Sequence, residues 1–301
     1  MTAQRGTWPF GWSRAAPGLF VLLWSTGFIG AKLGVPYAEP FTFLSLRFFL
    51  VLLLMVPLAL VLRARWPATW REAGHIAAAG LLIQGGYLAG CFAAIYHGMA
   101  AGLAALIVGM QPIVAAIAAY PLLGERVTRV QWIGLMLGFA SVALVMWPRA
   151  GLEIDTISVL WAAIALFSIS AGTLYQKRYC PSFDLRSGSV IQFGGALLLL
   201  LPLAVLTETM QVRWTGEFVF ALAWLALVLS IGAISLLFHL IEHGEATRVS
   251  SLFYLTPLVT ALMSYFIFGE ALTVLMVAGM LLGILGVALV LRKPGLPVSE
   301  P

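Results

Sequence analysis

Long apolar segments separated by short polar connections recur along the whole chain. A helix that crosses a bilayer needs about 20 mostly apolar residues, and ten segments reach or nearly reach that length. The pattern predicts spans at residues 17–34, 41–62, 76–96, 101–123, 130–147, 157–175, 188–206, 218–241, 249–268 and 271–291. Because the connections are short, no separate soluble domain is expected.

The composition agrees with lipid as the solvent. Of the 301 residues, 61% are hydrophobic and 10% are charged, whereas a soluble domain carries about 25% charged residues. Lipid offers the backbone no hydrogen bonds, so spans of this kind are helices. The sequence therefore predicts an all-α integral membrane protein. The first apolar segment lacks a small-residue cleavage site, so we expect it to remain as the first span.

Lysine and arginine placement predicts the orientation, since cytoplasmic loops carry an excess of both residues. Arg149 and Arg213 fall in outer loops, and Lys32 and Arg47 fall at the edges of the first and second spans. With a cytoplasmic N-terminus, the other 13 of the 17 basic residues lie inside: Arg5, Arg14, Arg63, Arg65, Arg71, Arg126, Arg129, Lys177, Arg178, Arg186, Arg248, Arg292 and Lys293. We therefore expect both termini in the cytoplasm.

The chain repeats itself after 145 residues, as Gly124-Glu125 and Gly269-Glu270 illustrate. The same offset relates Ser25, Gly27 and Lys32 to Ser170, Gly172 and Lys177, Pro112 to Pro257, Gly134 and Gly138 to Gly279 and Gly283, and segment 142–145 to 287–290. Each half holds five spans, an odd number, so the second half enters the membrane upside down. The sequence thus predicts ten transmembrane helices in two inverted five-helix repeats, residues 1–148 and 149–301.

Inverted repeats are typical of secondary transporters, which hold the substrate near the midplane between the halves. The alternative is a duplicated scaffold that serves stability alone. Gly134-x-x-x-Gly138 and Gly279-x-x-x-Gly283 are typical helix-packing motifs, which predicts that the fifth and tenth spans pack together in one chain or mediate a dimer. Lys32 and Lys177 lie at opposite mouths, as anchors or as gates.

The motifs of both halves resemble the EamA-type domain of the drug/metabolite transporter (DMT) superfamily. The resemblance covers nearly the whole chain and rests on Gln111-Pro112 to Gly124-Glu125, Thr256-Pro257 to Gly269-Glu270, Leu23-Trp24-Ser25-Thr26-Gly27-Phe28 followed by Lys32, and Arg47-Phe48. It implies export of amino acids and small metabolites across the cell inner (cytoplasmic) membrane. Within the superfamily the chain most resembles bacterial aromatic amino acid exporters.

Polar side chains inside a membrane are costly, so they tend to face the bundle interior or a cavity. On this basis the expected substrate-binding residues are Trp24, Ser25, Gln84, Tyr87, Trp161, Ser168, Tyr175, Gln192, His239 and Tyr254. Gln84, Tyr87 and Cys91 share one face of the third span. Gln192 occupies the repeat position of Arg47.

Each of these residues also has a structural interpretation. Trp161 is as consistent with an interfacial aromatic belt, and Ser168, like Ser235 of the eighth span, is as consistent with close helix packing. His239 is equally compatible with a buried histidine whose hydrogen bonds are made within the protein.

Mechanistic motifs narrow the function. The sequence contains no P-loop, no H-E-x-x-H and no G-x-S-x-G, and its twelve acidic residues map to loops, termini or span ends. We therefore expect a facilitative or exchange transporter and no enzyme, cofactor, metal or nucleic-acid partner. A membrane-embedded enzyme acting on a lipid or small apolar substrate is the alternative, and a channel ranks third. The expected partners are the bilayer and a small-molecule substrate, with the protein a monomer or homodimer.

Overall fold

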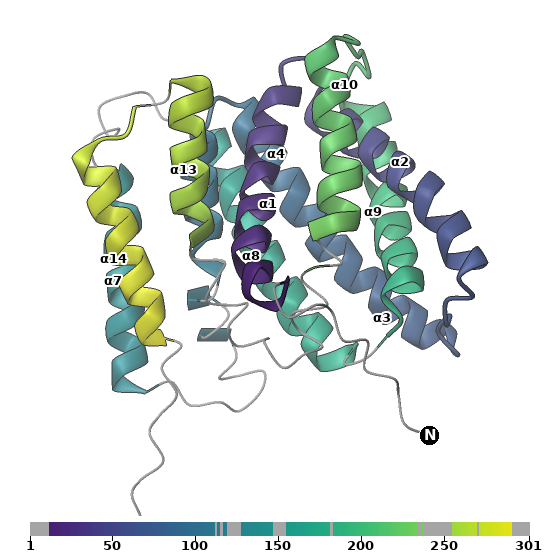
Figure 1. Ribbon diagram of the computed structural model, residues 1–301, viewed down its shortest axis with the longest axis horizontal. Helices are drawn as coiled ribbons and strands as arrows, with labels where there is room; N and C mark the ends of the chain where they lie inside the picture. The colour runs from purple at the N-terminus through teal and green to yellow at the C-terminus, as the bar shows by residue number, and fades with distance from the viewer. Residues whose placement is uncertain are drawn as a thin grey trace, which may run out of the picture.

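The computed structural model describes residues 12–111, 113–114, 117–118, 128–146, 155–180, 183–233, 236, 255–269 and 271–290. These residues form helices, apart from turns and an isolated β-bridge between Ala38 and Val212 (Figure 1). The elements are α1 (Trp12–Gly34), α2 (Pro40–Val61), α3 (Trp70–Gly80), the π-helix η1 (Leu81–Gly86), α4 (Tyr87–Tyr96), α5 (Ala101–Val108), α7 (Arg129–Met146), α8 (Thr156–Tyr179), α9 (Leu185–Thr207), α10 (Gly216–Ala223), the π-helix η3 (Trp224–Ala233), α13 (Leu255–Phe268) and α14 (Val274–Val290).

Each predicted span overlaps a helix of the described part. Five continuous stretches are long and apolar enough to cross a membrane: Pro40–Val61, Trp70–Tyr96, Thr156–Tyr179, Leu185–Thr207 and Gly216–Ala233. Shorter apolar helices are Gly18–Gly34, Trp132–Ser141, Leu258–Phe268 and Val274–Gly286. Large apolar side chains face outward, for example Leu198 at 80% and Phe266 at 79% exposure, which suits a surface surrounded by lipid.

The third span begins earlier than the apolar pattern indicates, at Trp70 rather than residue 76. The Thr69 hydroxyl accepts a hydrogen bond from the Glu72 backbone N–H at 3.2 Å, and the Glu72 carboxylate accepts one from the Ala68 N–H at 3.0 Å. These bonds satisfy N–H groups at the start of the helix. Hydropathy alone misses this extension because the added turns are polar.

Helices α7 and α14 pack as an antiparallel pair through their small residues. The Ser141 hydroxyl donates to the Gly279 carbonyl at 2.6 Å. A Cβ built on Gly286 would lie only 2.6 Å from the Gly134 carbonyl oxygen, so the backbones are in direct contact there. The two packing motifs therefore meet within one chain, as expected for small residues in membrane helices. The repeat offset relates these contacts to each other, since Ser141 corresponds to Gly286 and Gly134 to Gly279.

Helices α2 and α9 form a second antiparallel pair that is tied at both ends. At the end nearest Pro40, the Glu208 carboxylate accepts hydrogen bonds from the backbone N–H groups of Phe41 and Thr42, both at 2.7 Å. The Glu39 carboxylate accepts from the Thr209 N–H at 2.6 Å. We call Glu39, Phe41, Thr42, Glu208 and Thr209 the upper clamp, after its place in Figure 1.

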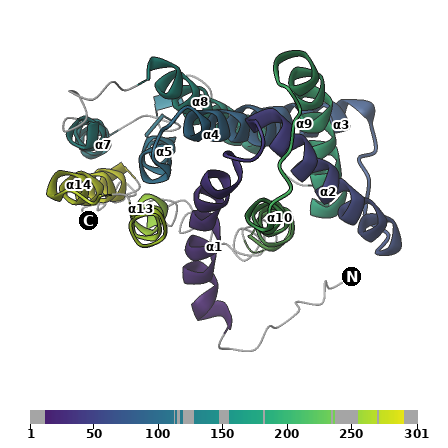
Figure 2. The ribbon, with the colours of Figure 1, turned by 90° about the horizontal axis from the view of Figure 1, so that it is seen from above.

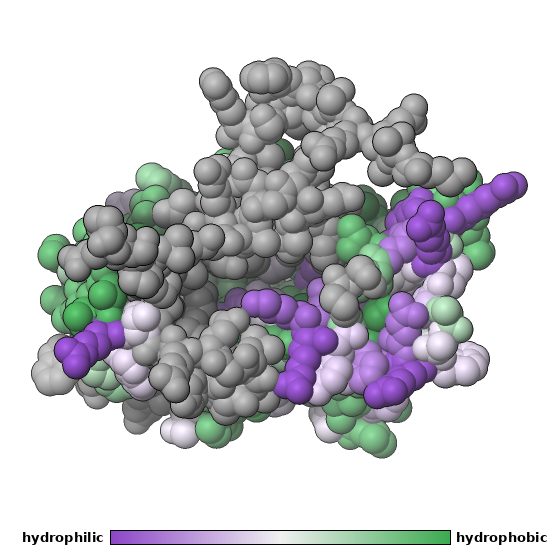
Figure 3. All heavy atoms as spheres, turned by 90° about the horizontal axis from the view of Figure 1, so that it is seen from below, coloured by the Kyte–Doolittle hydropathy of each residue, from purple (hydrophilic) through white to green (hydrophobic). Residues whose placement is uncertain are grey.

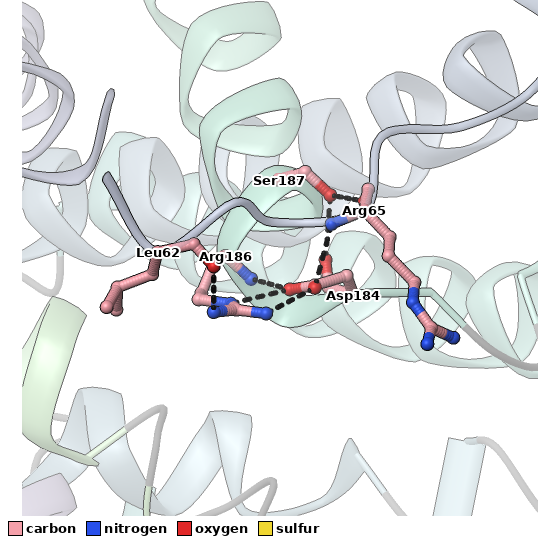
Figure 4. Close-up of polar contacts among 5 residues, drawn as sticks. All are labelled: Leu62, Arg65, Asp184, Arg186 and Ser187. Carbon is pink, nitrogen blue, oxygen red and sulfur yellow. Dashed lines mark hydrogen bonds and ion pairs between the residues drawn. The ribbon is translucent and has the colours of Figure 1, made fainter. Parts of the chain in front are cut away.

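The lower clamp ties the other end of this pair and consists of Arg65, Asp184, Arg186 and Ser187. The Asp184 carboxylate accepts from the Arg65 backbone N–H at 3.0 Å and forms an ion pair with Arg186 at 2.7 Å, as Figure 4 shows. The Ser187 hydroxyl donates to the Arg65 carbonyl, and Arg186 donates to the carbonyl of Leu62 at 3.1 Å. Each clamp joins the start of one helix to residues beyond the end of the other.

Basic residues collect on the face that carries the lower clamp. Figure 3 views the molecule from below and shows hydrophilic side chains gathered there. Among the described residues, this face holds Arg63, Arg65, Arg71, Lys177, Arg178 and Arg186, at the ends of α2, α3, α8 and α9. The upper ends of the described helices hold Lys32 and Arg213.

The core lies where α1 meets both halves of the chain. Figure 2 shows α1 between α13 and α10, with α4 and α8 beyond its end toward the top of the picture. Buried rings of Phe28, Phe43, Phe92 and Phe218 pack together there, with Phe43 between Phe92 and Phe218 at centroid distances of 5.2 and 5.0 Å.

Both halves interrupt one span with a π-helix at corresponding places. Shifting η1 by 145 residues gives residues 226–231, which lie inside η3. A π-turn displaces the following side chains from their α-helical positions and is frequent at functional sites. Here η1 precedes Tyr87, and η3 contains Ser230, so both lead directly to the cavity described next.

Candidate substrate cavity

A cavity inside the helix bundle lies between α1, α2, η1, α4 and η3. This central cavity has a volume of about 50 Å³ and is lined by Trp24, Gly27, Phe28, Ala31, Arg47, Ile83, Gln84, Tyr87, Leu88, Cys91, Phe92 and Leu229. A side pocket of about 20 Å³ shares Trp24, Phe28 and Tyr87 and adds Ala105, Val108, Gly109, Gln111, Ile169 and Thr256. Mostly apolar walls with a few polar groups are the usual make-up of a small-molecule site.

The central cavity is closed down in this structure. A water molecule needs about 10–15 Å³ of such space, so 50 Å³ holds a few waters and is too small for an amino acid. Binding of a solute of that size therefore requires the lining side chains or helices to separate. Leu229, whose methyl group would lie 2.7 Å from a Cβ on Gly27, is one of the close contacts that narrow it.

Tyr87 contributes a phenol side chain to the wall of the central cavity. It is the first residue of α4, directly after η1, and is buried. Trp24 of α1 and Cys91, one turn further along α4, line the same cavity. These three side chains therefore place polar atoms on the wall of a mostly apolar cavity.

Arg47 lies two turns inside α2, and its side chain is only 3% exposed. The sequence had placed it at the edge of the second span, and that prediction is wrong. Its Nη2 and Nε donate to the Ser230 hydroxyl at 3.0 and 3.3 Å, and Ser230 in turn donates to the Leu225 carbonyl at 3.1 Å. Within the described part of the chain, no carboxylate pairs with this guanidinium.

Ser25 makes a helix-packing contact and does not line the central cavity. Its hydroxyl donates to the Val21 carbonyl at 2.7 Å and lies 3.3 Å from the Thr256 carbonyl oxygen. Its role in the described residues is therefore to join α1 to α13.

Trp161 and Ser168 also pack against neighbouring helices. The Trp161 ring meets Phe41 edge-on at a centroid distance of 5.8 Å. The Ser168 hydroxyl sits where a Cβ on Gly86 would clash, at 2.5 Å. The predicted face of the sixth span is thus turned toward η1 and the start of α2, and neither residue lines the cavity.

Tyr175 and Gln192 belong to the polar end of the bundle beside the lower clamp. The Tyr175 hydroxyl lies 2.8 Å from Nδ1 of His75, and the Gln192 amide donates to the Gln176 amide oxygen at 2.9 Å. Neither lines the central cavity. His239 and Tyr254 lie outside the described residues, as does Ser235.

The structure therefore brings Trp24, Gln84 and Tyr87 of the expected set around one cavity. It adds Arg47, with its partner Ser230, and Gln111 and Thr256 of the side pocket. The repeat offered a signal for two of these, because Gln111 and Thr256 occupy equivalent positions directly before the repeated prolines.

The profile of the EamA-like transporter family matches the chain twice, at residues 18–147 and at 156–292. The chain belongs to the EamA-like transporter family. It is thus a multi-pass membrane transporter, and both matched segments contribute to the cavity lining.

Relatives of this EamA-like transporter carry transporter names. The uncharacterized transporter YvbV of Bacillus subtilis is 30% identical, over 91% of this chain and 89% of the relative. A probable amino-acid metabolite efflux pump of Salmonella typhimurium is 26% identical, over 88% and 89%. A solved crystal structure aligns with a TM-score of 0.65 and 19% identity, over 92% of this chain and 96% of the other, which shows a shared fold.

Proposed function

We propose that this protein exports amino acids, aromatic ones foremost, and related small metabolites across the cytoplasmic membrane by alternating access. The central cavity is the observation that carries the proposal. Aromatic side chains of Trp24, Phe28, Tyr87 and Phe92 line it, and such rings pack favourably against an aromatic solute at an angle or with offset stacking. The similarity to a probable amino-acid metabolite efflux pump supports the amino acid class.

Alternating access rests on the further proposal that residues 1–148 and 149–301 are inverted repeats. The antiparallel α2–α9 and α7–α14 pairs, each made of equivalent spans, support it. So do the matched π-helices and the two matches to the family profile. In such folds, rocking of the two halves about a central site exposes it to each side in turn.

The proposed orientation places the lower clamp and both termini in the cytoplasm. The basic residues of the described loops on that face support it through the positive-inside rule. We further propose that transport is facilitative or an exchange, because no described residue that lines the central cavity or the side pocket is acidic. Proton- or sodium-coupled sites commonly use an acidic residue at this depth.

Counterflow in proteoliposomes tests the proposed function. Vesicles loaded with unlabelled L-phenylalanine are expected to accumulate labelled phenylalanine, tyrosine and tryptophan transiently, with saturation and without chemical conversion. Tyr87→Ala is expected to impair counterflow, whereas Tyr96→Ala, at the exposed end of the same helix, serves as the matched control. Chemical turnover without flux would favour an enzyme, and flux that does not saturate would favour a channel.

An imposed pH or sodium gradient tests the energy coupling separately. The facilitative proposal expects no accumulation of solute above its outside concentration in response to either gradient. Accumulation that disappears when the gradient is collapsed would show a coupled pump.

A further inference from the structure

The Arg47 guanidinium is a buried cation whose described hydrogen-bonding partner is one hydroxyl. Two of its nitrogen atoms contact Ser230, although a guanidinium carries five N–H donors. Burial of a charge without a counter-ion is costly. If the side chain at this position served packing alone, a neutral side chain would fill the same space at a lower free-energy cost.

In the second half of the chain, a neutral side chain occupies the equivalent position. Gln192 occupies the position that corresponds to Arg47, 145 residues later. It is also buried, and its amide N–H donates to the Gln176 amide oxygen. The fold therefore does not itself require a cation at this place in a half, and the charge of Arg47 needs another explanation.

The cavity supplies that explanation. Of the described residues that line the central cavity and the side pocket, Arg47 carries the one full charge. Gln84 lines the same wall, and no described residue hydrogen-bonds its side-chain amide. The cavity thus presents a cation and a polar amide within an aromatic surface, which complements a solute that has one anionic end and an apolar body.

We propose that Arg47, oriented by Ser230, binds the carboxylate of the transported solute and makes the protein selective for solutes that carry one. The planar guanidinium matches a carboxylate through two parallel hydrogen bonds, which a lysine ammonium does not reproduce. Gln84 lines the same cavity, and its amide oxygen is the acceptor that we assign to the ammonium group of an amino acid. This inference rests on the proposed transport function and specifies the chemical class recognised at its site.

The test compares four ligands that share a phenylpropyl body. L-phenylalanine and 3-phenylpropionate carry the carboxylate, whereas L-phenylalaninamide and 3-phenylpropan-1-ol lack it. Binding to the full chain in detergent is measured by thermal stabilisation, and transport by counterflow in proteoliposomes. The two acids are expected to bind the wild type at least about tenfold more tightly than the amide and the alcohol, as loss of a charge-assisted hydrogen bond implies.

Variants of Arg47 test whether the preference for carboxylate ligands comes from its guanidinium group. Arg47→Gln is expected to weaken both acids by about tenfold or more and to leave the alcohol nearly unchanged, and Arg47→Lys is expected to be intermediate. Arg71→Gln removes an exposed charge from α3 and is the matched control, with wild-type preference. If Arg47→Gln does not fold, the intermediate preference expected of Arg47→Lys is the test of this residue, and wild-type preference in Arg47→Lys overturns its role.

The outcomes separate this inference from the proposed function. Equal binding of acids and alcohol by the wild type, or an acid preference that survives in Arg47→Gln, overturns the role of Arg47. Flux of the amide or alcohol in preference to the acids supports transport and overturns carboxylate recognition. Acid binding that depends on Arg47, without flux of any of the four ligands, supports the carboxylate site and counts against transport.

Discussion

The Ser25 hydroxyl lies 3.3 Å from the carbonyl oxygen of Thr256, and so joins α1 to α13 across 231 residues of sequence. The repeat-equivalent residues make the corresponding contact, since the Ser170 hydroxyl lies 3.5 Å from the carbonyl oxygen of Gln111. Each serine also donates to the carbonyl four residues before it, at 2.7 Å. Each half thus contributes a serine to hold a helix of the other, and the side pocket, which Gln111 and Thr256 line, lies beside these two contacts.

Close packing of α7 on α14 predicts a strong effect at Gly286. Gly286→Ala places a methyl group 2.6 Å from a backbone oxygen, and overpacking of this kind costs about 1–3 kcal/mol. Gly194→Ala is the matched control, because nothing lies within 4 Å of a Cβ there. Thermal unfolding in detergent should show a lower midpoint for the first variant than for the second. Equal midpoints would show that the α7–α14 contact does not support the fold.

The lower clamp predicts a pH dependence that depends on Asp184. Hydrogen bonding from Arg186 lowers the pKa of Asp184 from 3.8 to about 2. A lowered pKa in the folded state stabilises the fold above the unfolded value and loses this effect as pH falls from 3.8 through 2. Wild type should therefore lose more stability than Asp184→Asn over that range of pH. Parallel pH profiles for the two proteins would contradict a folded-state role of the clamp.

The different surroundings of Tyr87 and Trp161 predict different kinds of defect. Tyr87 lines the cavity, whereas Trp161 packs on Phe41. Tyr87→Ala should raise the KM for counterflow by about tenfold, in line with loss of an aromatic contact to the solute. Trp161→Ala should lower the unfolding midpoint while leaving KM nearly unchanged. A raised KM in Trp161→Ala with normal stability would instead place Trp161 in the solute site.

The proposed orientation predicts opposite labelling of the two faces. Cys91 and Cys180 are buried and are replaced first by alanine or serine. Gln211→Cys, in the exposed upper loop, should then react with an impermeant thiol reagent on intact cells, and Arg71→Cys should react only after lysis. The reverse labelling pattern would show that the orientation is opposite to the proposed one.

Span positions could be predicted because apolar length is a property of the sequence itself. The start of the third span could not, since Thr69 and Glu72 extend the helix through caps that hydropathy does not measure. The depth of Arg47 was missed for a related reason. A charge lowers local hydropathy and so marks a span edge, whereas the residue is buried through its contact with Ser230, 183 positions away.

Helical spacing predicted which residues share a face, but not what that face meets. Gln84, Tyr87 and Cys91 do line one cavity. Ser168 lies on an equally regular face, yet that face packs on Gly86 and leaves no space for a solute. The neighbour of a face depends on the arrangement of all helices, which periodicity within one helix does not contain.

The two clamps hold helices α2 and α9 together at both ends. Hydrogen bonds to charged groups contribute about 1.5–3 kcal/mol each, and carboxylates accept such bonds at both ends of this pair. Separating these two helices at either end would break several of these hydrogen bonds at once. In the proposed alternating access, we therefore expect α2 and α9 to move as one body and the solute to enter and leave between other helices.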